Sequence, residues 1–166
     1  MQTSYQIYAD RAVCGDAYDT NDNTEDITLA NASNNTIYFG RMVVQVSGSA
    51  GQIDRPSATG GVYAGVARRD INEPQAGFYG LQSAVSIRKK GIIWVEVDQD
   101  VTPDDAVYVR FAANGARTSL GVFRKDVDNL NNVPTADLIS SARFVFVNSF
   151  TDKNGVKIAA VDLTLI

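Results

Sequence analysis

Residues 85–111 constrain the fold of this chain more than any other stretch, because alternating side chains and turn residues agree there for more than twenty positions. In residues 92–97 and again in 107–111, apolar side chains occupy every second position, as they do in a β-strand with one covered face. Lys89-Lys90-Gly91 and residues 101–105, which contain Pro and two Asp, are typical of turns. The stretch predicts three consecutive antiparallel strands that need a second layer to cover their apolar face.

The rest of the chain has the same character. Short apolar or alternating runs are separated by Gly, Asn, Asp and Pro, and no amphipathic helical pattern occurs; a helical turn at 135–139 would be too short to change the class. We therefore predict an all-β fold, an antiparallel β-sandwich or barrel with an extended N-terminal segment and long polar loops. The further strands are expected at 36–39, 41–46, 62–67, 120–123, 142–147 and 156–165.

The N-terminal part is acidic. Residues 16–35 are rich in Asp, Asn and Thr, with Ile27 and Leu29 as an apolar island, and are predicted to be a loop or a solvent-facing hairpin. Residues 19–23 have the spacing of a calcium loop, but Thr24 and Ala30 replace its Gly and Glu, which favours a solvated acidic loop over a weak cation site or a docking surface for a basic partner. We take 1–35 as an N-terminal arm and acidic loop of the same fold, and 36–166 as one all-β domain.

Composition excludes several chemistries. The chain has no His and one Cys, so Ser-His and Cys-His catalysis and ordinary zinc sites are excluded, and Cys14 is expected to be a small buried hydrophobe. The carboxylate pairs Asp98 with Asp100 and Asp104 with Asp105 lie in predicted turns, where Asp serves the backbone. We expect no enzyme activity and no cofactor.

Charge and hydropathy limit the partners. The net charge is −4, which disfavours nucleic acid, and no apolar run is long enough to span a membrane. The N-terminus lacks the pattern of a secretion signal, so we expect the chain to stay in the compartment where it is made.

Three blocks in the same order resemble a known family. They are residues 4–13 (SYQIYADRAV), residues 57–67 (SATGGVYAGVA), and residues 86–109, which open with SIRKKG and end with VTPDDAVYV. Together they resemble the structural cement, or capsid decoration, proteins of tailed bacteriophages. Family members often carry Gly-Asp before the Val-Tyr-Val strand, where this chain has Asp104-Asp105-Ala106, so the type of that turn stays open.

The resemblance implies a non-enzymatic virion protein on the capsid exterior, made in the cytoplasm of a host bacterium. It would bind the major capsid protein and clamp neighbouring subunits, as a homo-oligomer with a trimer favoured and a dimer possible. The candidate interface residues lie in the N-terminal segment, the acidic loop and an aromatic pair between glycines: Tyr5, Ile7, Tyr8, Asp16, Asp19, Phe78 and Tyr79.

One alternative function stays open from the sequence. Trp94, Tyr63, Tyr79 and Tyr108 could form a stacking platform in a carbohydrate- or receptor-binding β-sandwich of a phage particle. The strand-like surroundings of Trp94 favour a packing role for it instead. Phe78 and Tyr79 could likewise pack inward and make no contact between subunits.

Overall fold

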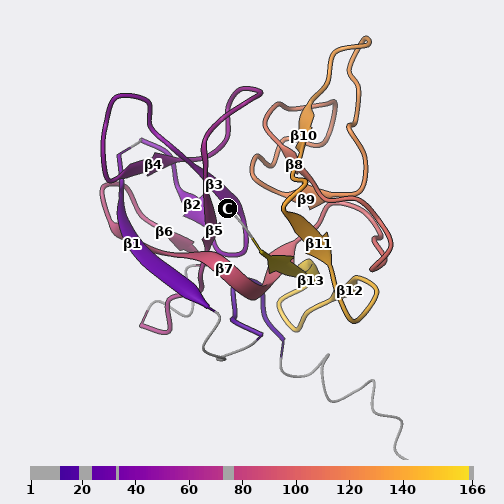
Figure 1. The fold of residues 1–166 in the computed structure, drawn as a ribbon, viewed down its shortest axis with the longest axis horizontal. Helices are drawn as coiled ribbons and strands as arrows, with labels where there is room; N and C mark the ends of the chain where they lie inside the picture. Colours follow the sequence, from indigo (N-terminus) through magenta and orange to yellow (C-terminus); the bar gives the residue numbers. More distant parts are fainter. Residues whose placement is uncertain (1–11, 19–23, 33, 73–76, 165–166) are drawn as a thin grey trace, which may run out of the picture.

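The computed structural model describes residues 12–18, 24–32, 34–72 and 77–164, and these residues form strands and loops without any helix (Figure 1). The predicted all-β class is confirmed. No described helix has the length and apolar character needed to cross a membrane. The strands are β1 (Glu25–Asn31), β2 (Ile37–Tyr38), β3 (Met42–Gln45), β4 (Gln52–Asp54), β5 (Tyr63–Ala67), β6 (Phe78–Tyr79), β7 (Ala84–Glu96), β8 (Tyr108–Arg110), β9 (Phe123–Arg124), β10 (Ala136–Leu138), β11 (Ala142–Phe144), β12 (Phe150–Thr151) and β13 (Lys157–Leu163).

Five strands close into a small barrel, in the order β1-β4-β3-β5-β7 with β7 pairing back to β1. The β1–β4 pair is parallel and the other pairs are antiparallel. Of the two predicted architectures, a barrel is present and the antiparallel sandwich is not confirmed. The predicted extended N-terminal segment and long polar loops are not confirmed by these elements. The barrel interior is filled by a buried apolar cluster that includes Val43, Ile53, Ala64, Val85 and Ile87.

Strand β7 connects the barrel to the rest of the molecule. Its first part pairs with β1 and β5, and its second part, from Gly91 to Glu96, pairs with β13. The predicted turn at residues 89–91 is therefore wrong, because the chain continues as one strand through Gly91. This glycine has φ +100°, and a Cβ there would lie 2.7 Å from Cγ2 of Thr24. The positive φ that glycine allows lets β7 continue where its pairing changes from β1 to β13, and it does not reverse the chain.

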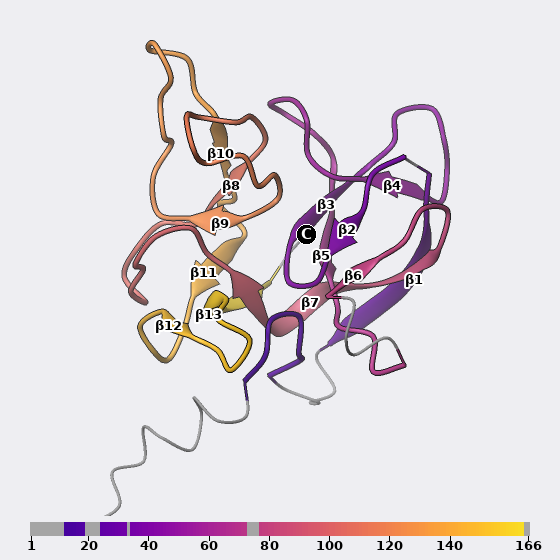
Figure 2. The ribbon, with the colours of Figure 1, turned by 180° about the vertical axis from the view of Figure 1, so that it is seen from behind.

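The three-stranded sheet β10-β8-β9 forms a second layer against this half of β7. Val107, Val109 and Phe111 are all buried, as their alternation predicted. However, β8 pairs with β9 and β10, so the predicted meander of β7 with β8 is wrong. The alternation of apolar residues predicts which face of a strand is buried, but it does not predict which strand lies next to it in the sheet. Figures 1 and 2 both show strands β1 to β6 on one side of the molecule and the β8–β10 layer on the other, with β7 reaching from the barrel to β13.

Two further expectations are corrected. Residues 25–31 form β1, where a loop or solvent-facing hairpin was predicted, because Ile27 and Leu29 alternate and pack against the barrel cluster. The possible helical turn at 135–139 is instead β10, which pairs with β8. The division of the chain at residue 35 stays a prediction.

A third apolar cluster lies on the other face of β7. It contains Trp94 and Cys14, with Ile158 and Ala160 from β13. Cys14 is buried, as predicted, and its thiol donates a hydrogen bond to the carbonyl oxygen of Phe39 at 3.1 Å. Burial, reinforced by nearby carboxylates, raises the pKa of this thiol well above its ordinary value. A thiol of this kind is inert while the protein is folded.

Candidate docking surface

The carboxylate pairs that could have served catalysis are engaged in structural contacts. Asp98 accepts hydrogen bonds from Arg110 and Arg124, and Asp105 accepts one from the backbone of Thr102 at 2.7 Å, inside its own turn. Asp100 pairs with Lys157 at 2.6 Å, and this hydrogen bond lowers the pKa of the Asp100 carboxyl. Among the described residues no cluster of His, Cys, Asp and Glu side chains could hold a metal ion.

The predicted interface residues are only partly placed. Tyr5, Ile7, Tyr8 and Asp19 lie outside the described residues. The Asp16 carboxylate lies 3.4 Å from the guanidinium of Arg69, which reduces the free negative charge that it offers to a partner.

Two acidic residues of β1 also have cationic partners. Asp26 pairs with both Arg68 and Arg88, and Glu25 pairs with Lys89. Burial alone would raise the pKa of Asp26, but the hydrogen bonds and charges of the two arginines outweigh it and lower the pKa overall. The acidity around β1 is therefore largely used inside the chain to fasten β1 to β5 and β7.

Phe78 and Tyr79 form a short strand, β6, that pairs with β2. Tyr79 packs inward: it is 6% exposed, its ring meets that of Phe39 edge-on at 5.2 Å, and its hydroxyl donates to the carbonyl oxygen of Arg68 at 2.9 Å. Burial raises its pKa. Tyr79 could therefore contribute to an interface only indirectly, by holding β6 in place.

Phe78 faces outward with Tyr38, which sequence reasoning did not single out. Their ring centroids lie 5.5 Å apart, and Tyr38 is 41% exposed. The Arg41 guanidinium lies 4.3 Å from the centre of the Tyr38 ring and binds Glu96 through two hydrogen bonds, of 2.7 and 3.1 Å. The signal for Tyr38 was present in the sequence: Ile37 and Phe39, on either side of it, belong to the buried cluster, so alternation directs Tyr38 outward. We call Tyr38, Phe78 and Arg41 the aromatic patch.

Two grooves border the aromatic patch. One, of about 520 Å³, is lined by residues that include Cys14, Phe39, Arg69 and Glu96. The other, of about 290 Å³, has Tyr38 at its edge and is continued by Arg55 and residues 118–120. Exposed aromatic side chains with a neighbouring Arg are enriched at protein interfaces. Such a patch, held by the β2–β6 strand pair and an ion pair, suits a protein partner.

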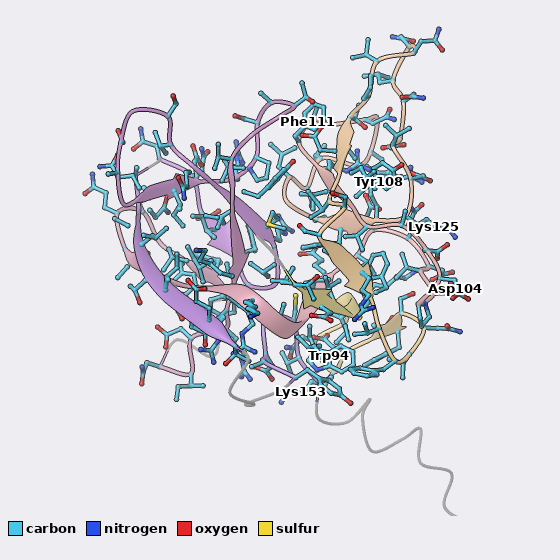
Figure 3. The ribbon with its side chains drawn as sticks, viewed as in Figure 1. Trp94, Asp104, Tyr108, Phe111, Lys125 and Lys153 are labelled. Atoms are coloured by element: carbon cyan, nitrogen blue, oxygen red, sulfur yellow. The ribbon has the colours of Figure 1, made fainter. Side chains whose placement is uncertain are left out.

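The four aromatic residues of the possible sugar platform do not gather on one surface. Trp94 is 4% exposed and packs against the rings of Tyr18 and Phe150. Figure 3 shows Trp94 and Tyr108 on different parts of the molecule. Tyr63 donates its hydroxyl proton to Asp137 at 3.0 Å, and burial together with this bond raises its pKa. The platform suggested from the sequence is not formed.

Comparison with known proteins points to one family. A family model described as structural cement protein (E217 gp24/Pam3 gp6) matches residues 1–164. Among solved structures, a chain of "The capsid of Myoviridae Phage XM1" is similar in fold, with a TM-score of 0.66 and 18% identity over 92% of this chain and 89% of that chain. A comparison with curated proteins finds no match.

Proposed function

Since this chain belongs to the structural cement protein family of bacteriophages, we propose that it binds the outer surface of a phage capsid and clamps neighbouring major capsid protein subunits. The match to the family over residues 1–164 carries this proposal. The protein would act as a non-enzymatic virion component and as a homo-oligomer, with a trimer favoured and a dimer possible. It would be made in the host cytoplasm and added to the exterior of the shell.

A clamp of this kind would stabilise the shell because its binding is coupled to the assembly of the capsid subunits. A protein that binds the assembled shell and has no affinity for loose subunits stabilises the shell by the free energy of its own binding. The aromatic patch supports such a role, because Tyr38 and Phe78 present apolar surface between two grooves and are held by the β2–β6 strand pair, whose other two side chains, Ile37 and Tyr79, are buried. The N-terminal residues Tyr5, Ile7, Tyr8 and Asp19, with Asp16, stay candidates for a second contact.

The proposal can be tested with capsids that lack the protein. Purified wild-type chain is mixed with them, and bound chain is measured after sedimentation. Replacing both Tyr38 and Phe78 by Ser should weaken attachment at least tenfold, because the central apolar anchors of an interface carry most of its binding energy. Val62→Ser, which changes an exposed apolar side chain outside the patch, is the matched control. Undiminished attachment of the double variant would remove the aromatic patch from the proposal, and failure of the wild-type chain to attach would contradict capsid binding itself.

A further inference from the structure

The sheet formed by β7 and β13 is covered by a second layer of strands on one face only, as far as the described residues show. Ile93 and Val95 of β7 belong to the cluster beneath the β8–β10 layer. Ile92 and Trp94 alternate with them and belong to the cluster on the opposite face, which takes no residue from another sheet. The partly exposed side chains on this face, which we call the Phe146 surface, are Tyr18, Ile92, Val145, Phe146, Val147, Phe150 and Val156. An apolar surface of this kind marks a contact site.

Phe146 is the most exposed aromatic side chain of this surface, at 59%, and its backbone is strained. Its φ is +66°, and Val147 donates a backbone hydrogen bond to the carbonyl oxygen of Val145 across it, at 2.8 Å. These two features are those of the rare form of γ-turn, which is unfavourable for a bulky residue. Strained residues are found where the strain serves a contact or a ligand, so Phe146 is held in position for a partner.

The strained turn lies in a bulge of the edge strand of the sheet. Val145 donates a backbone hydrogen bond to Ala160 at 3.0 Å, and Phe150 is paired with Ile158, so residues 146–149 bulge out between two positions that are paired to β13. Bulges at a sheet edge change the direction of a side chain. Here the bulge turns the Phe146 ring toward the uncovered face.

Phe146 is the outer end of a row of aromatic contacts. Its ring stacks on that of Tyr18, with centroids 4.9 Å apart and planes at 25°. Tyr18 meets Trp94 at 5.7 Å, and Trp94 meets Phe150 at 5.4 Å. Because Trp94 is 4% exposed, the row is anchored inside the molecule. Rings that are held in place beforehand lose little conformational entropy when their outer end is covered.

The segment that precedes Ala12 starts at this surface. Ala12 is buried in the same cluster as Ala160 of β13, and residues 1–11 before it lie outside the described residues. The backbone N–H of Cys14 donates to the Asp152 carboxylate at 3.3 Å, which fixes the chain to the turn between β12 and β13. Residues 1–11 are therefore attached beside the Phe146 surface.

The length and the pattern of this segment fit the surface. An extended chain spans about 3.4 Å per residue, so Ile7 can lie up to about 17 Å from Ala12. Neighbouring strands are about 4.8 Å apart, so this length is enough to cross from β13 to Phe146 at the sheet edge. In an extended segment, Tyr5, Ile7 and Ala9 share one side, and Gln6, Tyr8 and Asp10 share the other. The first side is apolar, like the surface.

We propose that residues 1–11 lie across the Phe146 surface of their own chain in the free protein, with Tyr5 and Ile7 against Phe146 and Val147. The covalent link favours this occupant over a separate molecule, because a short tether gives an effective concentration of about a millimolar. Even a weak apolar contact then forms within one chain rather than between copies at micromolar concentration. Tyr8 would face away from the surface and stay available to a capsid. The inference concerns the free chain and does not depend on capsid binding.

Disulfide trapping in the full-length chain tests both the surface and the copy that fills it. Ile7→Cys combined with Val147→Cys should form an intramolecular disulfide, which leaves a monomer whose only thiol is the buried Cys14. Gln6→Cys with Val147→Cys has nearly the same tether but the opposite side of the segment, and it should close at least fivefold more slowly. Cross-linked dimers in place of the monomer would assign the surface to a second copy, and equal rates for the two variants would show no docking. Either result would overturn the inference.

Chymotrypsin, which cleaves after aromatic residues, measures whether the segment is covered. Phe146→Gly removes the ring and also relieves the positive φ, so the melting temperature should not fall. Cleavage after Tyr5 and Tyr8, followed by intact mass, should become at least fivefold faster in this variant. Leu81→Ser, at an exposed apolar residue elsewhere, is the control and should leave the rate unchanged. An unchanged rate in Phe146→Gly would contradict the proposed contact.

Discussion

The ion network under the 128–135 hairpin gives the most quantitative prediction. Arg110 and Arg124 are fully buried and share Asp98 and Asp128, with contacts of 2.7 to 3.0 Å. Burial raises the pKa of Asp98, and the charge of Arg124 offsets only part of this, so its charged form depends on the two arginines. Asp98→Asn keeps the size of the side chain and removes its charge, which leaves two buried guanidinium groups short of a counterion.

Removing one partner of a buried ion pair costs about 3–5 kcal/mol when the remaining charge is left unpaired. In Asp98→Asn the Asp128 carboxylate would still lie 2.7 and 3.0 Å from the two arginines, so the free energy of unfolding should fall by a smaller amount, about 1–3 kcal/mol. In a domain of this size each kcal/mol corresponds to about 2–4 °C in melting temperature, so Asp98→Asn should lower it by roughly 2–12 °C. Thermal and urea unfolding can be followed by the fluorescence of Trp94, the only tryptophan in the chain. Asp100→Asn is the matched control, since Asp100 is 86% exposed and its loss should leave the melting temperature unchanged. An Asp98→Asn variant as stable as the wild type would refute the reasoning.

Three other properties follow from the structure. Because the pKa of Asp26 is lowered in the folded state, its stabilising effect is present above its ordinary pKa and is lost as the pH falls through the lowered value; Asp26→Asn should therefore flatten the acid side of the stability profile measured by urea unfolding. Gly65→Ala should destabilise the barrel strongly in thermal unfolding, because φ is +134° and a Cβ would lie 2.3 Å from the carbonyl oxygen of Arg88, whereas Gly48→Ala, with open space around it, should cost only about 1–2 kcal/mol of backbone strain. The Cys14 thiol should not react with a thiol reagent until the protein unfolds, and rapid reaction under native conditions would contradict its burial.

The fold class and the covered faces could be predicted from alternation, but strand pairing could not. Val107 and Val109 are buried as the pattern indicated, yet they belong to a layer stacked on β7 and not to a strand beside it. Gly91 is a second example. A glycine after two lysines is compatible with a turn, and it is equally compatible with a continuous strand whose hydrogen-bonding partner changes at that point. Those choices depend on contacts between distant segments, which a local pattern does not contain.

The burial of charged side chains could not be predicted from the sequence either. Alternation puts Arg110 on the face opposite Val109, where solvent would be expected, but the loop that carries Asp128 covers that face. For the docking surface, the sequence identified Phe78 and missed its partner Tyr38, because their proximity arises only from the pairing of β2 with β6. The N-terminal candidates lie outside the described residues and stay predictions.

The most direct test of a cement function is the copy number of this chain in intact particles. Purified particles of the phage that encodes it can be analysed by quantitative mass spectrometry, with the major capsid protein as the reference. Our account predicts a fixed ratio near one, or a simple fraction of it, as expected for a component that covers the shell. Absence of the chain from the particle, or only a few copies in each, would contradict it.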